Sequence, residues 1–318
     1  MQRLSLALIL AIAAPLAVAQ WSPTKPVRII VPFPAGGIVD LMARTISDKL
    51  ASQLGQPVLV ETRPGAMSSI GTEAVARSDA DGHTLLLATP SHATLPSLTK
   101  VSWHPTKDFA GVAMLGHVAN LAVVPASLEP KTLAEFVDYA KARPGKLNFI
   151  NAGNGTSQTL TVELFRKNTK LDLVSVGYKG YPPAMPDLIN AQIQFSVVPF
   201  GVGLPHVRGG KLRPLAVVAP GRNKLLPDVP TMAEAGFAES QVVSWYAFLA
   251  PAATPKAAVA GLNAAFARAH TDAEVLSRIE KVGGEALPTG KPQEVDTMLV
   301  REGERWAVFV KETGLKIE

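Results

Sequence analysis

The segment that most constrains the fold is residues 27–55, where a buried strand, a glycine-rich loop and an amphipathic helix follow one another. Apart from Arg28, "VRIIV" is β-branched and apolar, which is typical of a strand buried on both faces inside a parallel sheet. "IVDLMARTISDKLASQLG" then places apolar residues at helical spacing and ends on Gly55, a suitable C-cap. The strands "QPVLVET" and "HTLLLAT" follow, with the crossover helix "IGTEAVARSDADG" between them. The pattern predicts a parallel βαβ sheet.

A second α/β pattern begins near residue 126. Helices are expected over 132–145 and 159–169, and strands over 146–152, 171–178, 193–199 and 212–219. From "VVSWYAFLAP" onward the chain turns to Ala-rich amphipathic helices that would cover a core. A length of 318 residues suffices for two domains. We predict domain one from residues 20–125 together with 244–318, domain two from 126–243, and a two-strand hinge between them.

The first twenty residues, "MQRLSLALILAIAAPLAVAQ", have the features of a secretory signal peptide. A basic Arg3 precedes an apolar stretch over residues 4–16, and the Ala-Val-Ala at 17–19 suits a signal peptidase. The stretch is shorter than the ~20 residues that span a bilayer. We therefore expect residues 1–19 to be removed. Because the chain has no cysteine, a lipid-anchored cysteine and disulfides are excluded. The sequence predicts a soluble periplasmic protein.

Charge and motifs exclude several classes of function. The 31 Lys and Arg residues exceed the 26 Asp and Glu, but they are scattered and no aromatic residues interleave them, so nucleic-acid binding is not expected. The nucleotide-binding G-x-x-x-x-G-K-[ST], the hydrolase G-x-S-x-G and the zinc-binding H-E-x-x-H are absent, and the six histidines lack metal-ligand spacing. We expect no enzyme activity, no cofactor and no metal. A Ser-His-Asp triad assembled in space stays open as an alternative.

Three segments have the composition of an anion site. They are "PFPAGGIVD" at 32–40, "TPSHA" at 89–93 and "NAGNGTS" at 151–157. In open α/β sheets, ligands bind beyond the carboxyl ends of strands. Glycines there let the backbone approach a ligand closely, and the next helix offers unpaired N–H groups that attract an anion. Hydroxyl groups within these segments could donate hydrogen bonds to carboxylate oxygens.

Each of these features also has a purely structural interpretation. The Gly36-Gly37 pair could form only a tight turn, and Asp40 could simply supply negative charge to the first helical turn. Tyr178 could be an aromatic residue that fills a strand end. Asn154 begins a short pattern that also matches a glycosylation acceptor. Two glycine-rich loops in separate domains nevertheless favour the ligand-binding interpretation.

Nearly the whole mature chain resembles the Bug family of periplasmic solute receptors, the substrate-binding proteins of tripartite tricarboxylate transporters. The resemblance is carried by "KPVRIIVPFPAGGIVDLMAR", "LGQPVLVETRPGA", "DGHTLLLAT", "KDFAGVA", "ARPGKLNFINAGNGTSQTLTVELF", "YKGYPPAMPDLINAQIQ", "GGKLRPLAVVA", "LPDVPTMAEAGF" and "RWAVFVKETG". It implies an α/β fold of the periplasmic binding protein type II-like class, with two α/β domains and a ligand cleft between them. It also implies that residues 33–37 and 154–157 grip carboxylates through backbone amides, hydroxyls and bridging waters.

The chain departs from the family at the ligand. The "PGAGGNIG" usual in the family is "PGAMSSIG" here, which places Met67, Ser68 and Ser69 at positions of smaller or amide side chains. Thr159 replaces a frequent histidine, and Val198 replaces a frequent aspartate. These changes favour an acid with an apolar or aromatic body over a polyhydroxylated or amino-bearing one.

The sequence thus predicts a monomeric receptor that captures a small aromatic or aliphatic mono- or dicarboxylate and delivers it to a membrane permease. A ligand sensor on the same scaffold and a periplasmic hydrolase are the alternatives. The candidate ligand-binding residues are Phe33, Ala35, Gly36, Gly37, Asp40, Thr89, Ser91, Asn154, Gly155, Thr156, Ser157, Thr159, Tyr178 and Val198.

Overall fold

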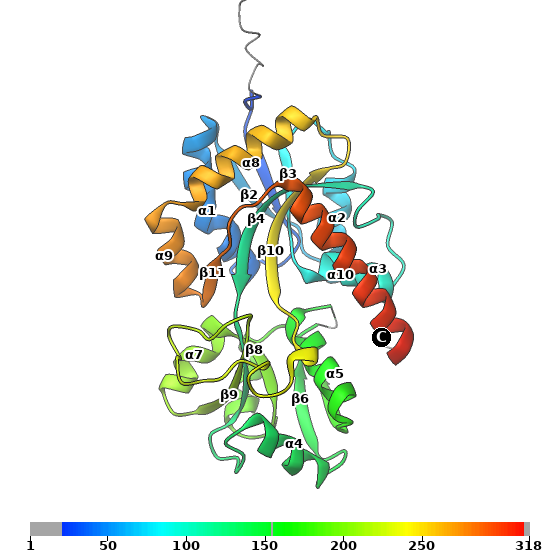
Figure 1. Ribbon diagram of the computed structural model, residues 1–318, viewed down its shortest axis with the longest axis vertical. Coiled ribbons are helices and arrows are strands. Elements are labelled where there is room, and N and C mark those ends of the chain that lie inside the picture. Colours follow the sequence, from blue (N-terminus) through cyan, green and yellow to red (C-terminus); the bar gives the residue numbers. More distant parts are fainter. Residues whose placement is uncertain (1–20, 154, 315–318) are drawn as a thin grey trace, which may run out of the picture.

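A computed structural model describes residues 21–153 and 155–314. It has two α/β lobes stacked along the long axis (Figure 1). The expected signal peptide and the expected mature start at Gln20 lie outside the described residues. Within those residues, no helix is both long and apolar enough to cross a membrane.

The upper lobe contains a six-stranded sheet in the order β11-β4-β10-β3-β1-β2. The strands are β1 (Val27–Val31), β2 (Val58–Thr62), β3 (Thr84–Ala88), β4 (Phe109–Val118), β10 (Ser244–Pro251) and β11 (Gly284–Ala286). β1 is parallel to both β2 and β3, which confirms the predicted parallel unit. The sheet is mixed overall, because β10 runs antiparallel to β3 and β4, and β11 runs antiparallel to β4.

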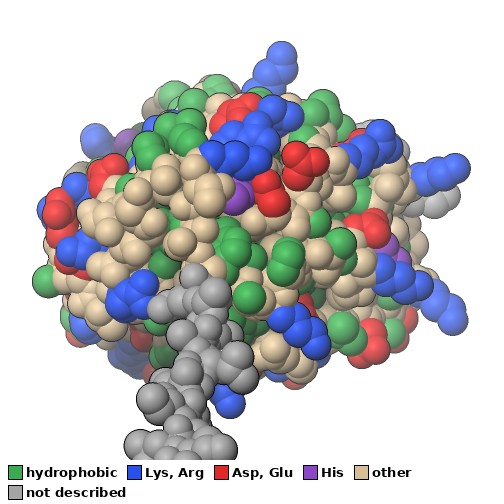
Figure 2. All heavy atoms as spheres, turned by 90° about the horizontal axis from the view of Figure 1, so that it is seen from above, with side chains coloured by type: hydrophobic (Ala, Val, Ile, Leu, Met, Phe, Trp, Pro, Cys, Tyr) green, Lys and Arg blue, Asp and Glu red, His purple; other side chains and the backbone are tan. Residues whose placement is uncertain are grey.

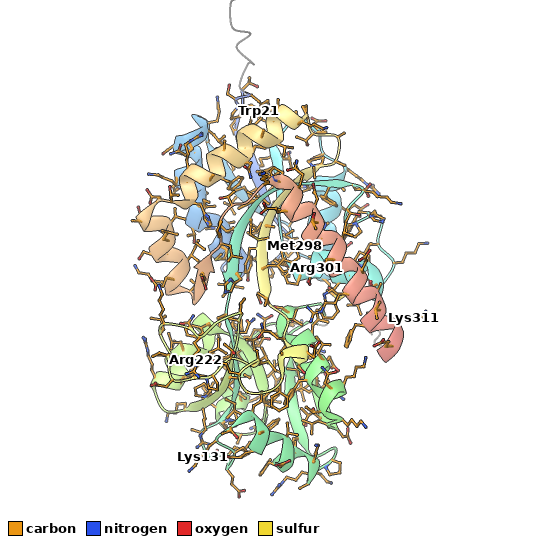
Figure 3. All side chains as sticks on the ribbon, viewed as in Figure 1. Trp21, Lys131, Arg222, Met298, Arg301 and Lys311 are labelled. Carbon is orange, nitrogen blue, oxygen red and sulfur yellow. The ribbon has the colours of Figure 1, made fainter. Side chains whose placement is uncertain are left out.

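Helices cover both faces of the upper sheet. One core joins β1 residues Val27, Ile29 and Val31 to α1 (Ile38–Leu54), α8 (Lys256–His270) and α9 (Ala273–Lys281). On the other face Ile30 packs with α2 (Ser69–Ala76), α3 (Pro90–Leu98) and α10 (Pro292–Thr313). β1 is therefore buried on both sides, as its sequence predicted. Trp21, labelled in Figure 3, packs against the positions of Gly82 and Gly261 beside α8.

The lower lobe holds two small sheets. β5 (Asn120–Pro125) lies between β8 (Ser196–Pro199) and β9 (Leu212–Val218) and is antiparallel to both. β6 (Leu147–Asn151) is parallel to β7 (Leu173–Gly177). A single parallel bridge between Phe149 and Phe195 joins the two sheets. The helices of this lobe are α4 (Leu133–Lys141), α5 (Ser157–Thr169), α6 (Met185–Ile189) and α7 (Phe200–Arg208). The chain also forms short 3-10 helices. They are η1 (Ala66–Ser68) before α2, η2 (Pro182–Ala184) before α6, and η3 (Ala238–Ser240) before β10.

The chain crosses between the lobes twice, first from β4 to β5 and later into β10 (Figure 1). The first boundary was predicted at residue 125, but β5 pairs with strands of the lower lobe. We therefore propose that the first crossing lies between Val118 and Asn120. The second predicted boundary, near residue 243, directly precedes Ser244, the first residue of β10.

α10 provides a further contact between the lobes. Trp306 and Phe309 on α10 form a buried cluster with Leu160 and Leu164 of α5 and with Val242 of the second crossing. The Nζ atom of Lys167 lies 3.0 Å from an Oε2 atom of Glu312 at the same place. Met298, Arg301 and Lys311 mark the course of α10 toward the lower lobe in Figure 3. Helix α5 is thus held from outside its own lobe.

Candidate functional site

The loop between β1 and α1 is organised around the carboxylate of Asp40. The Gly36 N–H donates to Asp40 Oδ2 at 2.9 Å, and the Arg44 Nε donates to Oδ1 at 3.0 Å. Burial alone would raise the pKa of Asp40, but these two hydrogen bonds hold that pKa below its ordinary value. Gly36 has a φ of +75°, which favours glycine. The geometry therefore favours the structural interpretation of Asp40, whose charge is used inside the loop.

The same arrangement leaves the start of α1 open. Gly37 is the N-cap, and no described side chain accepts a hydrogen bond from the first amides of this helix. Gly36 and Gly37 are exposed, as is Ala35, while Phe33 is half-buried. Uncapped N–H groups and the positive end of the helix dipole together suit an anion.

A chain of three buried hydroxyl groups lies at the start of α3. The Thr89 Oγ1 is 2.9 Å from the Ser91 Oγ, which is 3.1 Å from the Ser68 Oγ. Thr89 and Ser91 are predicted site residues, whereas Ser68 was recognised only as a departure from the family. Ser68 ends a short segment of left-handed backbone, in which Ala66, Met67 and Ser68 have φ values of 43°, 53° and 85°. Left-handed backbone disfavours side chains with a Cβ atom, which fits the glycines that are usual in the family at positions 67 and 68.

The loop before α5 uses its hydroxyl groups largely for its own structure. Thr156 is the N-cap, and its Oγ1 accepts from the Thr159 N–H at 3.3 Å and donates to the Gly153 carbonyl at 2.9 Å. The Asn151 Oδ1 accepts from the Gly153 N–H at 3.0 Å. The predicted contact of the Thr156 hydroxyl with a ligand would have to replace one of these bonds. Asn154 lies outside the described residues.

Loops from the two lobes meet at Gly155 and Ser91. A Cβ atom placed on Gly155 would lie 3.8 Å from the Ser91 Cβ. The first loop joins the same region through α2, since a Cβ atom on Gly71 would lie 2.8 Å from the Pro32 Cβ. All three predicted segments therefore gather at the junction of the lobes.

Two predicted residues lie apart from this meeting point. Tyr178 follows β7, where its N–H donates to the Asn151 carbonyl at 2.9 Å and its hydroxyl donates to Asp187 Oδ2 at 2.5 Å. Burial and the neighbouring Asp187 raise the pKa of Tyr178 to about 12. Val198 is fully buried in the core with Leu121, against Gly203 of α7. The structure thus places the Val198 side chain in the core of the lower lobe, away from the loops.

Across residues 21–153 and 155–314, no cluster of three or more His, Asp or Glu side chains has a metal-binding arrangement. On the face shown in Figure 2, basic and acidic side chains are interspersed.

Two α/β lobes joined by paired crossings, with the loop at Gly155 of the lower lobe lying against Ser91 of the upper lobe, define the class of periplasmic binding proteins, and comparison with known structures confirms this fold. The chain belongs to the tripartite tricarboxylate transporter family receptors, because the model of that family matches residues 42–315. The resemblance to the Bug receptors is confirmed as well. Protein BugT of Bordetella pertussis is 35% identical over 311 residues, which cover 96% of this chain and 94% of BugT.

Two solved structures are similar over nearly their whole length. MatC from Rhodopseudomonas palustris with bound malate is 32% identical, with a TM-score of 0.79, and the match covers 91% of this chain and 99% of MatC. An R. palustris protein with adipate is 31% identical, with a TM-score of 0.82, and the match covers 92% of this chain and 99% of that protein.

Proposed function

We propose that this protein is a periplasmic receptor that binds a small carboxylate between its lobes and delivers it to the permease of a tripartite tricarboxylate-type transporter. It acts as a monomer and does not convert its ligand. The observation that carries the proposal is the meeting of Ser91 and Gly155 from opposite lobes, beside helix N-termini. Malate and adipate in the two similar structures support an aliphatic carboxylate as the ligand.

Amide groups rather than a free cation would hold the carboxylate at the first loop. The basic side chains near this loop are paired: the guanidinium of Arg44 is bound to Asp40, and Arg63, whose backbone N–H donates to the Val31 carbonyl, pairs with Glu61. The N–H groups at the start of α1 are open. Hydrogen bonds from amides aligned with a helix dipole stabilise a carboxylate without a salt bridge. Met67 at the η1 turn adds apolar surface, which would suit the hydrocarbon part of an acid.

The hydrolase alternative finds little support among the histidines. His83 Nδ1 lies 3.1 Å from Asp81 Oδ1, but the other ring nitrogen of His83 accepts the Thr24 N–H at 3.1 Å and contacts no serine there. His117 lies 3.7 Å from Glu285. Incubating the tightest-binding carboxylate with the protein and analysing it by mass spectrometry should recover the compound unchanged.

Calorimetry with malate, adipate and benzoate tests the proposal. At one hundred times its dissociation constant, a true ligand should raise the free energy of unfolding by ~2.7 kcal/mol. Gly37→Val should abolish binding, because its branched side chain would stand in front of the amides of α1. The backbone at Gly37, with φ −76° and ψ 168°, accepts valine, although the new Cβ would lie a tight 3.2 Å from the Pro34 carbonyl oxygen.

Gly303→Val is the matched control, because a Cβ there meets no described atom within 4 Å beyond its chain neighbours and the adjacent backbone of its own helix. It should bind as wild type does. If Gly37→Val binds the carboxylate as tightly as wild type, the first loop is not the carboxylate site.

A further inference from the structure

A closed ring of hydrogen bonds lies where the two crossings meet α5. Its members are Asn120, the first residue of β5, Ser244, the first residue of β10, and Ser157 and Gln158, the first two residues of α5. The Asn120 Nδ2 donates to the Ser244 Oγ at 2.8 Å, and the Gln158 Nε2 donates to the Asn120 Oδ1 at 2.7 Å. The Ser157 Oγ donates to the Gln158 Oε1 at 3.3 Å, and the hydroxyls of Ser157 and Ser244 are in direct hydrogen-bond contact.

The direction of the ring follows from proton counting. A serine hydroxyl has one proton. The Ser157 proton goes to Gln158, so the proton between the two serines must come from Ser244. The ring therefore runs from Asn120 to Ser244, Ser157, Gln158 and back to Asn120. Each side chain donates once and accepts once, an arrangement in which neighbouring hydrogen bonds strengthen one another.

All four side chains of this ring are buried. Asn120 is fully buried, Ser244 is 2% exposed, and Ser157 and Gln158 are 6% and 8% exposed. A buried polar group without a partner costs free energy, so a partly broken ring is unfavourable. The ring therefore selects one relative arrangement of the two crossings and the first turn of α5.

The first turn of α5 is also a part of the lower lobe that faces the upper lobe. Ser157 follows the N-cap Thr156, and Gly155 approaches Ser91. Further along, Leu160 and Leu164 of the same helix pack against Trp306 of α10. The apolar cluster fixes the body of α5, and the ring fixes the end from which its N–H groups point.

We propose that Asn120 and Ser244 are positioning residues for ligand capture. They hold the first turn of α5 in its gripping orientation only while the two crossings keep the arrangement seen here. A ligand bound at residues 155–157 thereby favours one hinge geometry without touching the hinge. This inference rests on the proposed function, since it assigns a role within the same site.

Variants of Ser244 test the proposal. Ser244→Ala removes the donor to Ser157 and the acceptor for Asn120, and Ser244→Thr restores the hydroxyl. Gln158→Met breaks the ring at another point with a side chain of similar length, so the test does not depend on a single variant. Ser196→Ala is the matched control, because Ser196 is a fully buried serine of β8 whose hydroxyl lies 3.4 Å from the Val197 carbonyl, outside the ring.

Two readouts are needed. Hydrogen–deuterium exchange of the amides at residues 157–161 is measured without ligand, and affinity is measured by calorimetry for the tightest binder among malate, adipate and benzoate. Ser244→Ala and Gln158→Met should speed exchange in this turn and weaken binding, each by about tenfold. Ser244→Thr should restore both quantities, and Ser196→Ala should change neither.

Wild-type exchange and wild-type affinity in both ring-breaking variants would overturn the proposal. An equal loss in Ser196→Ala would also overturn it, because the effect would then reflect general destabilisation. If wild type binds none of the three acids, the carboxylate function is refuted. The exchange measurement still decides whether the ring positions α5.

Discussion

His92 should make the stability of this protein depend on pH. It lies in the first turn of α3, next to Ser91, and is 2% exposed. Its ring stacks on Trp103 at a centroid distance of 4.9 Å and meets the edge of Phe109 at 4.7 Å. The Nε2 donates to the Pro105 carbonyl at 2.9 Å. Burial lowers the pKa of His92 from 6.5 to about 4, and the hydrogen bond to Pro105 offsets this only in part.

Whether stability rises or falls with pH depends on which state of the protein, folded or unfolded, binds the proton of His92. Between pH 6.5 and about pH 4, the unfolded chain protonates His92 while the folded protein does not. The contribution of neutral His92 to stability is therefore complete above pH 6.5 and is lost as the pH falls toward 4. The loss amounts to about 2 kcal/mol at pH 5 and reaches about 3 kcal/mol below about pH 4, where the folded protein is protonated as well. Burial also lowers the pKa values of His117 and His270, so these residues act in the same direction.

Replacing His92 by phenylalanine isolates the contribution of His92 to the pH-dependent loss of stability. His92→Phe keeps an aromatic ring in the stack but cannot titrate. Urea unfolding of wild type and variant at pH 7.5 and pH 5.0 gives the pH-dependent loss of each protein, and the loss should be smaller in the variant by about 2 kcal/mol. His206→Gln in α7 serves as the control and should keep the wild-type loss. Equal losses in wild type and His92→Phe would refute the reasoning.

The other predictions concern the contact between the lobes and the first loop. Phe309→Ala removes a ring that packs on Trp306 and should cost about 3 kcal/mol in urea unfolding. Val308→Ala on the exposed face of α10 should stay within about 0.5 kcal/mol of wild type, and similar losses in both would count against the packing argument. Asp40→Asn keeps an acceptor for the Gly36 N–H, so calorimetry should show unchanged or tighter binding of a plain carboxylate; a large loss would instead indicate a direct role of the charge. Small-angle scattering should show compaction with saturating carboxylate, whereas an unchanged radius of gyration would indicate a preformed site.

Local sequence patterns were sufficient for elements whose apolar spacing is regular and whose end is marked by a capping residue. β1 and α1 were predicted because the apolar spacing and Gly55 mark them directly, and Gly55 does adopt the left-handed C-cap conformation. β4 was not predicted as a strand, because Gly111 and Gly116 interrupt its apolar run. The reason for one of these glycines is distant in sequence: a Cβ on Gly111 would lie 2.6 Å from the Pro292 carbonyl oxygen of α10.

The candidate site was predictable in part for the same reason. Glycines and hydroxyls before helices marked the loops at 32–40, 89–93 and 151–157, but sequence could not decide whether Asp40 faces a ligand or its own loop. The hydrogen bonds from Gly36 and Arg44 favour the loop. The position of Val198 was transferred from the family, which fixes a residue type but not the direction of its side chain. The ring at Asn120 and Ser244 joins residues 124 positions apart, for which no local pattern exists.

The position of β10 has a consequence for the order in which parts of the chain can fold. β10 lies between β3 and β4, although the entire lower lobe separates it from them in sequence. As the chain becomes available from its N-terminal end, β3 and β4 are complete long before the strand that joins them. The strands of the lower lobe, by contrast, follow one another without interruption from β5 to β9. The lower lobe can therefore mature first, and the upper half must persist as an unfinished intermediate with open strand edges, the kind of species that chaperones protect from aggregation.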